Sequence, residues 1–300
     1  MLRGNTDLSF DDNDLISHDS DLPDFPSSIG VSRVPDHIRA NTFRGFREYV
    51  QELGGEADLY LRMGGVDPAL LADPDAYVPF ISVVRTLEIA ALALNMPDFG
   101  MQLGIRQEPG ITGPLAIAVA TSTTAREGIV CAARFVRFHN RAQRLAIEPV
   151  SAGMEIIVHD TVMEQQAPHI QQTERVVAFL YNLMRRFCGD DRVVAEVWFT
   201  HQPLAPLEAY RDVFGVTPRF GQAKSGVIVP SVMLDVERSG RSAFVRDLAI
   251  AHLEQVSPSD STPVTDRVRV ALDSTQQCLF GGDGPSKRGA GPDSDPGARP

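Results

Sequence analysis

Apolar residues in the N-terminal part of the chain recur at helical spacing. Phe43, Phe46 and Val50 fall on one helix face, and Gly54-Gly55 follows as a stop signal. The same spacing predicts further helices over about residues 58–63, 78–95, 113–120 and 125–140. Because the segment 113–120 is nearly all small and apolar, we expect it to be buried.

After residue 140 the apolar period changes from that of a helix to that of a strand. Two alternating segments, 144–148 and 154–159, flank a turn that ends in Gly153, and together they predict a β-hairpin. Further strands are predicted at 193–200, 218–220 and 226–229, and helices at 170–188, 206–214 and 242–253. Helices followed by strands mixed with helices are typical of an α+β domain. We therefore expect a helical N-terminal part packed on a small antiparallel sheet.

Local signals predict where some of these helices begin. Asp67 ahead of Pro68 is a suitable N-cap, and Thr124 with Glu127 three residues later forms the pattern of a capping box. The helix over 170–188 carries large apolar residues at helical spacing, which we interpret as core: Val176, Phe179, Leu183 and Phe187.

Composition divides the chain into four parts. Residues 1–34 are rich in acidic residues and turn formers, which predicts a disordered leader; docking on a partner is the alternative. Residues 35–240 are expected to form the folded domain, and 241–273 a helix, a polar linker and the start of another helix. Glycine, proline, serine and charge dominate 274–300, a composition that predicts a disordered tail.

The charge balance and the cysteines limit the class of protein. The net charge of −11 argues against non-specific binding to nucleic acid, because a protein that holds phosphates needs a cationic surface. The three cysteines are sparse and lack a CxxC spacing, which suits a reducing compartment. No secretory signal and no apolar run long enough for a membrane span is visible in the sequence. We therefore expect a cytoplasmic protein that does not associate with membranes.

Motifs of catalysis and metal binding are not found. The sequence contains no G-x-S-x-G, H-E-x-x-H or P-loop pattern, so we expect neither an enzyme nor a bound cofactor. Four histidines are not spaced as metal ligands, and His159 and His201 are interpreted as hydrogen-bonded histidines at the surface or edge of a sheet. Cys131 and Cys188 lie on apolar helices and are expected to be small core residues.

One aromatic cluster is a candidate wall of a ligand pocket. On the helix over 125–140, Phe135, Phe138 and His139 share a face, while Arg137 lies on another. Pockets combine apolar walls with a few polar groups, so these residues together with Tyr181 are predicted to border a small-molecule site. Ordinary packing of the helix on the sheet is the alternative interpretation.

Four segments in order resemble a known family. They begin at Val66-Asp67-Pro68, at Pro97-Asp98-Phe99-Gly100, at Thr121-Ser122-Thr123-Thr124 and at Phe199-Thr200-His201, and the last is followed by Tyr210-Arg211, Phe214-Gly215 and Arg219-Phe220-Gly221. In this combination the chain resembles the N-terminal ligand-binding, arabinose-binding-like domain of AraC/XylS-type transcription regulators, in the subgroup of ornithine-responsive and virulence-type activators. The resemblance extends over roughly residues 40–272.

The resemblance implies a cytoplasmic sensor that binds a small effector, such as a fatty acid, an amino acid or another metabolite. It also implies a homodimer, or a heterodimer with a paralogue, and a C-terminal pair of helix-turn-helix units. Only 266–272 resemble the beginning of those units, so a truncated or frameshifted form is expected, without direct DNA binding by this chain alone. The alternatives are an interaction module that pairs with an intact paralogue and a small hydrolase or isomerase.

Overall fold

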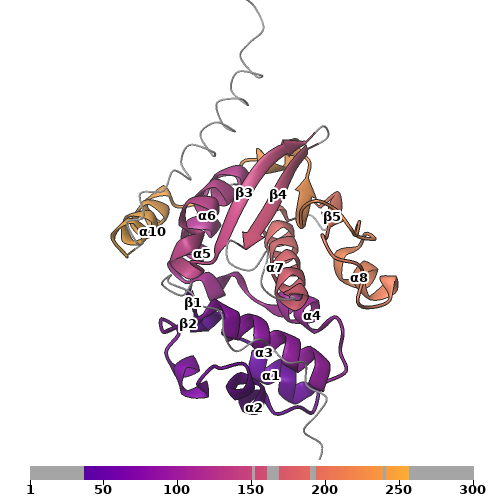
Figure 1. Ribbon diagram of the computed structural model, residues 1–300. Coiled ribbons are helices and arrows are strands. Elements are labelled where there is room, and N and C mark those ends of the chain that lie inside the picture. The colour runs from indigo at the N-terminus through magenta and orange to yellow at the C-terminus, as the bar shows by residue number, and fades with distance from the viewer. Residues whose placement is uncertain (1–36, 151–152, 161–168, 190–193, 239–240, 257–300) are drawn as a thin grey trace, which may run out of the picture. The chain divides into compact units, whose positions relative to one another are not determined.

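The computed structural model describes residues 37–150, 153–160, 169–189, 194–238 and 241–256 (Figure 1). The predicted leader over 1–34, the helix start at 266–272 and the tail over 274–300 lie outside the described residues. Within them the chain is an α+β domain, as the sequence predicts. Short helices come first, and strands mixed with helices follow.

The N-terminal helices share one apolar core, in which Phe46, Leu61, Phe80 and Leu87 are almost fully buried. A small sheet of β1 (His37–Arg39) and β2 (Tyr77–Pro79) borders it. The helical elements are η1 (Ala40–Phe43), α1 (Phe46–Glu52), α2 (Ala57–Met63), η2 (Pro68–Ala72), α3 (Phe80–Ala93) and α4 (Phe99–Arg106).

The helix predicted from residue 78 begins two residues later, at Phe80. Val78 lies in β2 instead, where it pairs with Ile38. The reason is Pro79, the N-cap residue of α3, because a residue that precedes proline is driven towards extended backbone. The proline therefore separates a short strand from the helix.

The capping signal at Thr124 is confirmed. Its hydroxyl accepts a hydrogen bond from the Glu127 backbone N–H at 3.2 Å at the start of α6 (Ala125–His139), and the Glu127 carboxylate accepts one from Thr123 at 2.9 Å. The expectation that 113–120 is buried holds for one side of the segment only, the side of Leu115, Ala118 and Val119. In α5 (Pro114–Ala120), which follows η3 (Pro109–Thr112), Ile117 is 49% exposed because only one side of the helix faces the core.

The main sheet has four antiparallel strands in the order β3-β4-β6-β5. The predicted hairpin is confirmed as β3 (Gln143–Val150) and β4 (Gly153–Asp160), followed in the sheet by β6 (Gly226–Val229) and β5 (Glu196–Trp198). The strand predicted at 218–220 is reduced to an isolated bridge between Arg219 and Trp198, next to Pro218, which has no backbone N–H to donate.

Helix α7 (Ile170–Cys188) connects the two halves of the fold. It crosses α4 closely, because Gly100 and Gly104 of α4 lie against the backbone carbonyls of Gln171 and Arg175. The remaining helices are α8 (Leu207–Phe214), α9 (Ser231–Leu234) and α10 (Ala243–Val256). Figure 1 shows α10 against α5 and the β3–β4 hairpin alongside α6.

Candidate ligand-binding site

A cavity of about 170 Å³ lies between η3, α5, α6, β3 and α7. Its wall is mostly aliphatic and aromatic, as is usual for small-molecule sites. Helix α7 contributes one continuous stripe of apolar side chains to it: Val176, Phe179, Leu180, Leu183 and Phe187. The apolar residues that face them from α5 and α6 are Leu115, Ala116, Val119, Ala120, Ala132 and Val136.

The apolar surface of α7 is wider than one core-facing stripe. Val177, Tyr181 and Met184 are buried in the core, whereas Val176 and Leu183, which the sequence places in the core, are only partly buried and line the cavity. In the sequence, two apolar stripes on one helix indicate that the helix has a second buried surface. They do not by themselves indicate that the second stripe borders a cavity.

Three polar side chains of the wall are themselves more than nine-tenths buried: His139 of α6, Gln143 of β3 and Arg175 of α7. We call them the buried pole. Arg175 donates to Gln107 Oε1 from Nη1 at 2.8 Å and to Gln172 Oε1 from Nε at 3.0 Å. Gln143 Oε1 accepts from Asn140 at 2.9 Å.

The imidazole of His139 is neutral. Burial lowers its pKa to about 3, and the charges of Arg175 and Arg39 act in the same direction. Its Nδ1 has no hydrogen-bond partner among the described residues, which is uncommon for a buried polar atom. The atom is also fully buried, so the cavity does not reach it.

The other charged side chains of the wall are more exposed: Arg186, Arg238 and Arg241. We call them the exposed pole. Arg186 donates to both carboxylate oxygens of Glu108, at 2.7 and 2.8 Å. The guanidinium of Arg238 lies 4.1 Å from the centre of the Phe187 ring, as a cation–π contact.

Of the four predicted site residues, His139 lines the cavity, and Phe135, Phe138 and Tyr181 do not. All three are buried in the adjoining core. Arg39 lies 4.0 Å from the Phe138 ring centre, and Tyr181 packs edge-on against Phe214. Their role in binding stays a prediction.

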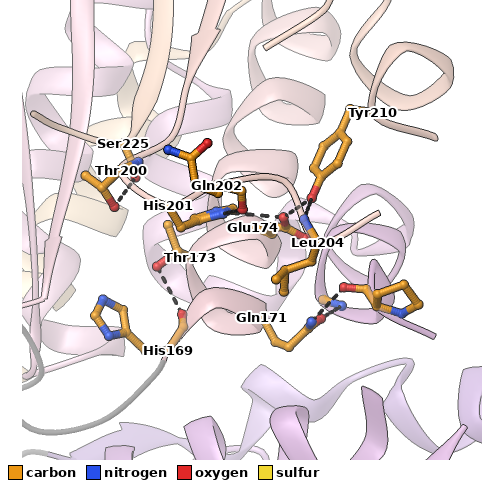
Figure 2. A network of polar contacts seen from close by, with 12 residues as sticks. His169, Gln171, Thr173, Glu174, Thr200, His201, Gln202, Leu204, Tyr210 and Ser225 are labelled. Atoms are coloured by element: carbon orange, nitrogen blue, oxygen red, sulfur yellow. Dashed lines mark hydrogen bonds and ion pairs between the residues drawn. The ribbon is translucent and has the colours of Figure 1, made fainter. Parts of the chain in front are cut away.

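A second polar cluster joins α7 to α8 and to the segment between β5 and α8 (Figure 2). Tyr210 donates its hydroxyl proton to Glu174 Oε1 at 2.6 Å and accepts from the Leu204 N–H at 3.1 Å. His201 Nε2 lies 3.7 Å from the same carboxyl oxygen, and its Nδ1 donates to the Gln202 carbonyl oxygen at 2.8 Å. His201 and Tyr210 both belong to the segments that carry the family resemblance.

Burial sets the protonation of this cluster. The Glu174 side chain is fully buried, and desolvation raises its pKa to about 8, against the opposing effect of the Tyr210 hydrogen bond. Burial also lowers the pKa of His201. The interpretation of His201 as a hydrogen-bonded histidine is confirmed, but its expected place at the surface is wrong, because its side chain is only 9% exposed and packs on Phe199 and Phe220. The side chain of His159 lies outside the described residues.

The acid–base cluster and the cavity are separate. Glu174, His201 and Tyr210 are not among the residues that line the cavity. Cys131 is buried, as expected of a small core residue, and burial raises its thiol pKa to about 11.

The described residues contain no group of three His, Cys, Asp or Glu side chains placed to hold a metal ion. Over the same ranges, every helix is too short or too polar to cross a bilayer.

An apolar cavity within such a fold is of the kind that binds small molecules. Comparison with known proteins identifies the family. The model of the "Arabinose-binding domain of AraC transcription regulator, N-term" matches residues 54–237, more than half of the chain. The chain therefore belongs to this family of AraC-type transcription regulators.

Two similar proteins are known. The HTH-type transcriptional regulator VirS of Mycobacterium tuberculosis, matched in two strains, is 29% identical over 233 residues, or 77% of this chain and 68% of VirS. The crystal structure of the transcriptional regulator CdpR from Pseudomonas aeruginosa covers 77% of this chain and 70% of CdpR, with a TM-score of 0.48 and 14% identity.

Proposed function

We propose that this domain is the effector-sensing and dimerisation part of an AraC-type regulator, that it acts in the cytoplasm, and that it is not an enzyme. The observation that carries the proposal is the apolar cavity of about 170 Å³ within the region that matches the family. An effector there would be enclosed by side chains from three helices, with a few polar groups to orient it.

The contacts of α5 suggest how occupancy would reach the rest of the regulator. Leu115 and Val119 of α5 line the cavity, and α5 also packs against α10. A ligand that binds one placement of α5 more tightly than another would shift the population towards that placement, and α10 would follow. The proposed output is a change in the relative placement of two subunits.

The net charge of −11 supports the further proposal that this chain does not hold operator DNA by itself. A gel-shift assay at physiological salt tests this directly. A specific duplex retarded with much higher affinity than random DNA would contradict the proposal.

Native mass spectrometry of the protein purified from its own host tests effector binding and dimerisation together. We expect a dimer that retains a small molecule. Leu183→Trp, which fills the cavity from α7, is expected to be purified without the bound small molecule. The control is Leu207→Trp on α8, at a site that is 40% exposed, and this variant is expected to retain the bound small molecule.

Equal retention by both variants would contradict the assignment of the cavity. A monomer at all concentrations would contradict dimerisation.

A further inference from the structure

The wall of the cavity has the wrong polarity for a sugar. Each hydroxyl group of a sugar needs hydrogen-bond partners once it is removed from water, and a hydroxyl group left without them is unfavourable. Here the stripe of α7 and the facing sides of α5 and α6 are apolar, and the well-buried polar side chains of the described wall are those of the buried pole. A ligand with one polar end and an apolar body fits this distribution.

The charged groups of the wall all have the same sign. They are Arg175, Arg186, Arg238 and Arg241, and no described Asp or Glu lines the cavity. Arginine stays protonated at every physiological pH and pairs well with carboxylate oxygens. The polar end of the ligand is therefore expected to be an anion.

The two poles differ in how far their polar side chains are removed from water. At the exposed pole, Arg186 is engaged by both oxygens of Glu108, and Arg238 is packed on Phe187. At the buried pole, Arg175 is hydrogen-bonded to Gln107 and Gln172. Gln143 Oε1 is already taken by Asn140, so the amide nitrogen of Gln143 is the donor left for a ligand. Donors beside a buried guanidinium form a suitable site for a carboxylate, since charge-assisted hydrogen bonds are strong away from water.

The dimensions limit the apolar part. Arg175 and Arg186 are eleven residues apart on α7, which corresponds to about 16 Å along the helix axis. The volume of about 170 Å³ is close to the roughly 150 Å³ of an engineered apolar cavity that holds benzene, a molecule of six carbons. The enclosed tail is therefore about six to eight carbons long.

From these observations we propose that the cavity takes a carboxylate with an apolar tail, with the carboxylate at the buried pole and the tail along α7 towards the exposed pole. This inference rests on the proposed function, because it names the chemical class of the effector.

Isothermal titration of the whole chain with three probes tests the chemical class. Octanoate carries the charge and the tail, 1-octanol carries the tail alone, and L-arabinose carries hydroxyl groups without a tail. We expect octanoate to bind about tenfold or more tightly than 1-octanol, and arabinose not to bind. Equal affinity for octanoate and 1-octanol, or binding of arabinose alone, would overturn the inference.

Substitutions at the two poles test the placement of the carboxylate. His139→Phe replaces the imidazole of the buried pole with an apolar ring and is expected to abolish the preference for octanoate, while 1-octanol binds as before, which shows that the cavity is intact. Gln143→Leu is the second variant if His139→Phe does not fold. Arg186→Gln is the matched control at the exposed pole, where we expect the preference to remain. Loss of the preference in Arg186→Gln alone would overturn the placement.

The outcomes separate this inference from the proposed function. Leu183→Trp is expected to abolish binding of octanoate and of 1-octanol. If both probes bind equally to the unmodified chain and both are lost in Leu183→Trp, the cavity is a ligand site and the anionic class is wrong. If neither substitution at Leu183 nor substitution at His139 changes octanoate binding, octanoate occupies another site and the placement is wrong.

Discussion

At the scale of single residues, the buried carboxyl group of Glu174 is the most informative side chain. It is completely removed from solvent, and its Oε2 has no hydrogen-bond partner among the described residues. The unfavourable desolvation of a carboxylate there explains why its pKa is raised to about 8. The folded protein consequently binds a proton that the unfolded chain releases near pH 4.5.

The pH dependence of stability follows from this difference. The contribution of Glu174 to the stability of the folded state is complete below about pH 4.5. It is lost as the pH rises towards about 8, because over that range Glu174 ionises only in the unfolded chain. Glu174→Gln keeps an acceptor for the Tyr210 hydroxyl and does not ionise. As the pH rises from about 5 to about 8, we expect the free energy of unfolding of the variant to increase by about 1–4 kcal/mol relative to that of the unmodified protein.

Urea unfolding at the two pH values measures this gain. The control is Glu208→Gln at an exposed position of α8, for which no comparable gain is expected. If the free energy of unfolding depends on pH in the same way for Glu174→Gln and for the unmodified protein, Glu174 is ionised in the folded state and the prediction is wrong.

At the scale of elements, the crossing of α4 and α7 decides how the site is built. Gly100 and Gly104 are one turn apart, and both face the backbone of α7. The absence of side chains there lets the two helices approach closely, and this approach positions Gln171 and Arg175. Arg175 in turn belongs to the buried pole of the cavity.

A methyl group at this crossing is expected to force the helices apart. In Gly100→Ala or Gly104→Ala the new Cβ would overlap the carbonyl oxygen of Gln171 or Arg175. We expect a loss of stability of about 1–3 kcal/mol or more, the usual cost of overpacking. Gly110→Ala is the control, because its nearest neighbour, Arg44 Nη1, would be 3.7 Å away. Thermal unfolding of the three variants measures the difference, and similar melting temperatures for all three would contradict this account of the crossing.

At the scale of the whole described fold, two apolar cores share α4. Phe99 and Leu103 belong to the core of the N-terminal helices, whereas Met101 belongs to the core that surrounds α7 and the main sheet. Because the same short helix is packed into both cores, neither is expected to unfold while the other remains intact.

A comparison of two unfolding curves tests this cooperativity. Trp198, the single tryptophan, lies in β5 of the main sheet, so its fluorescence reports on that half of the fold. Far-UV circular dichroism reports on all the helices, including α1–α3. We expect the two thermal transitions to coincide within error. A tryptophan transition well separated from the loss of helix would show that the cores unfold independently.

The sequence alone determined the features that depend on neighbouring residues. The α+β order, the hairpin around Gly153, and the cap formed by Thr124 and Glu127 could all be predicted, because apolar periodicity and capping act over a few residues. Where local signals competed, the prediction was wrong by a short distance. Helix α3 begins after Pro79, two residues later than predicted, and the strand predicted at 218–220 forms only a single bridge.

Only the tertiary structure decided which of two apolar stripes on α7 lines a cavity and which polar groups meet there. His139 could be proposed from its helix face, but Gln143 and Arg175 come from other elements, and their convergence depends on the close α4–α7 crossing. The partnership of Glu174, His201 and Tyr210 was likewise invisible in the sequence. The physical reason is that contacts between distant segments depend on packing geometry, whereas periodicity specifies only which face of each segment is apolar.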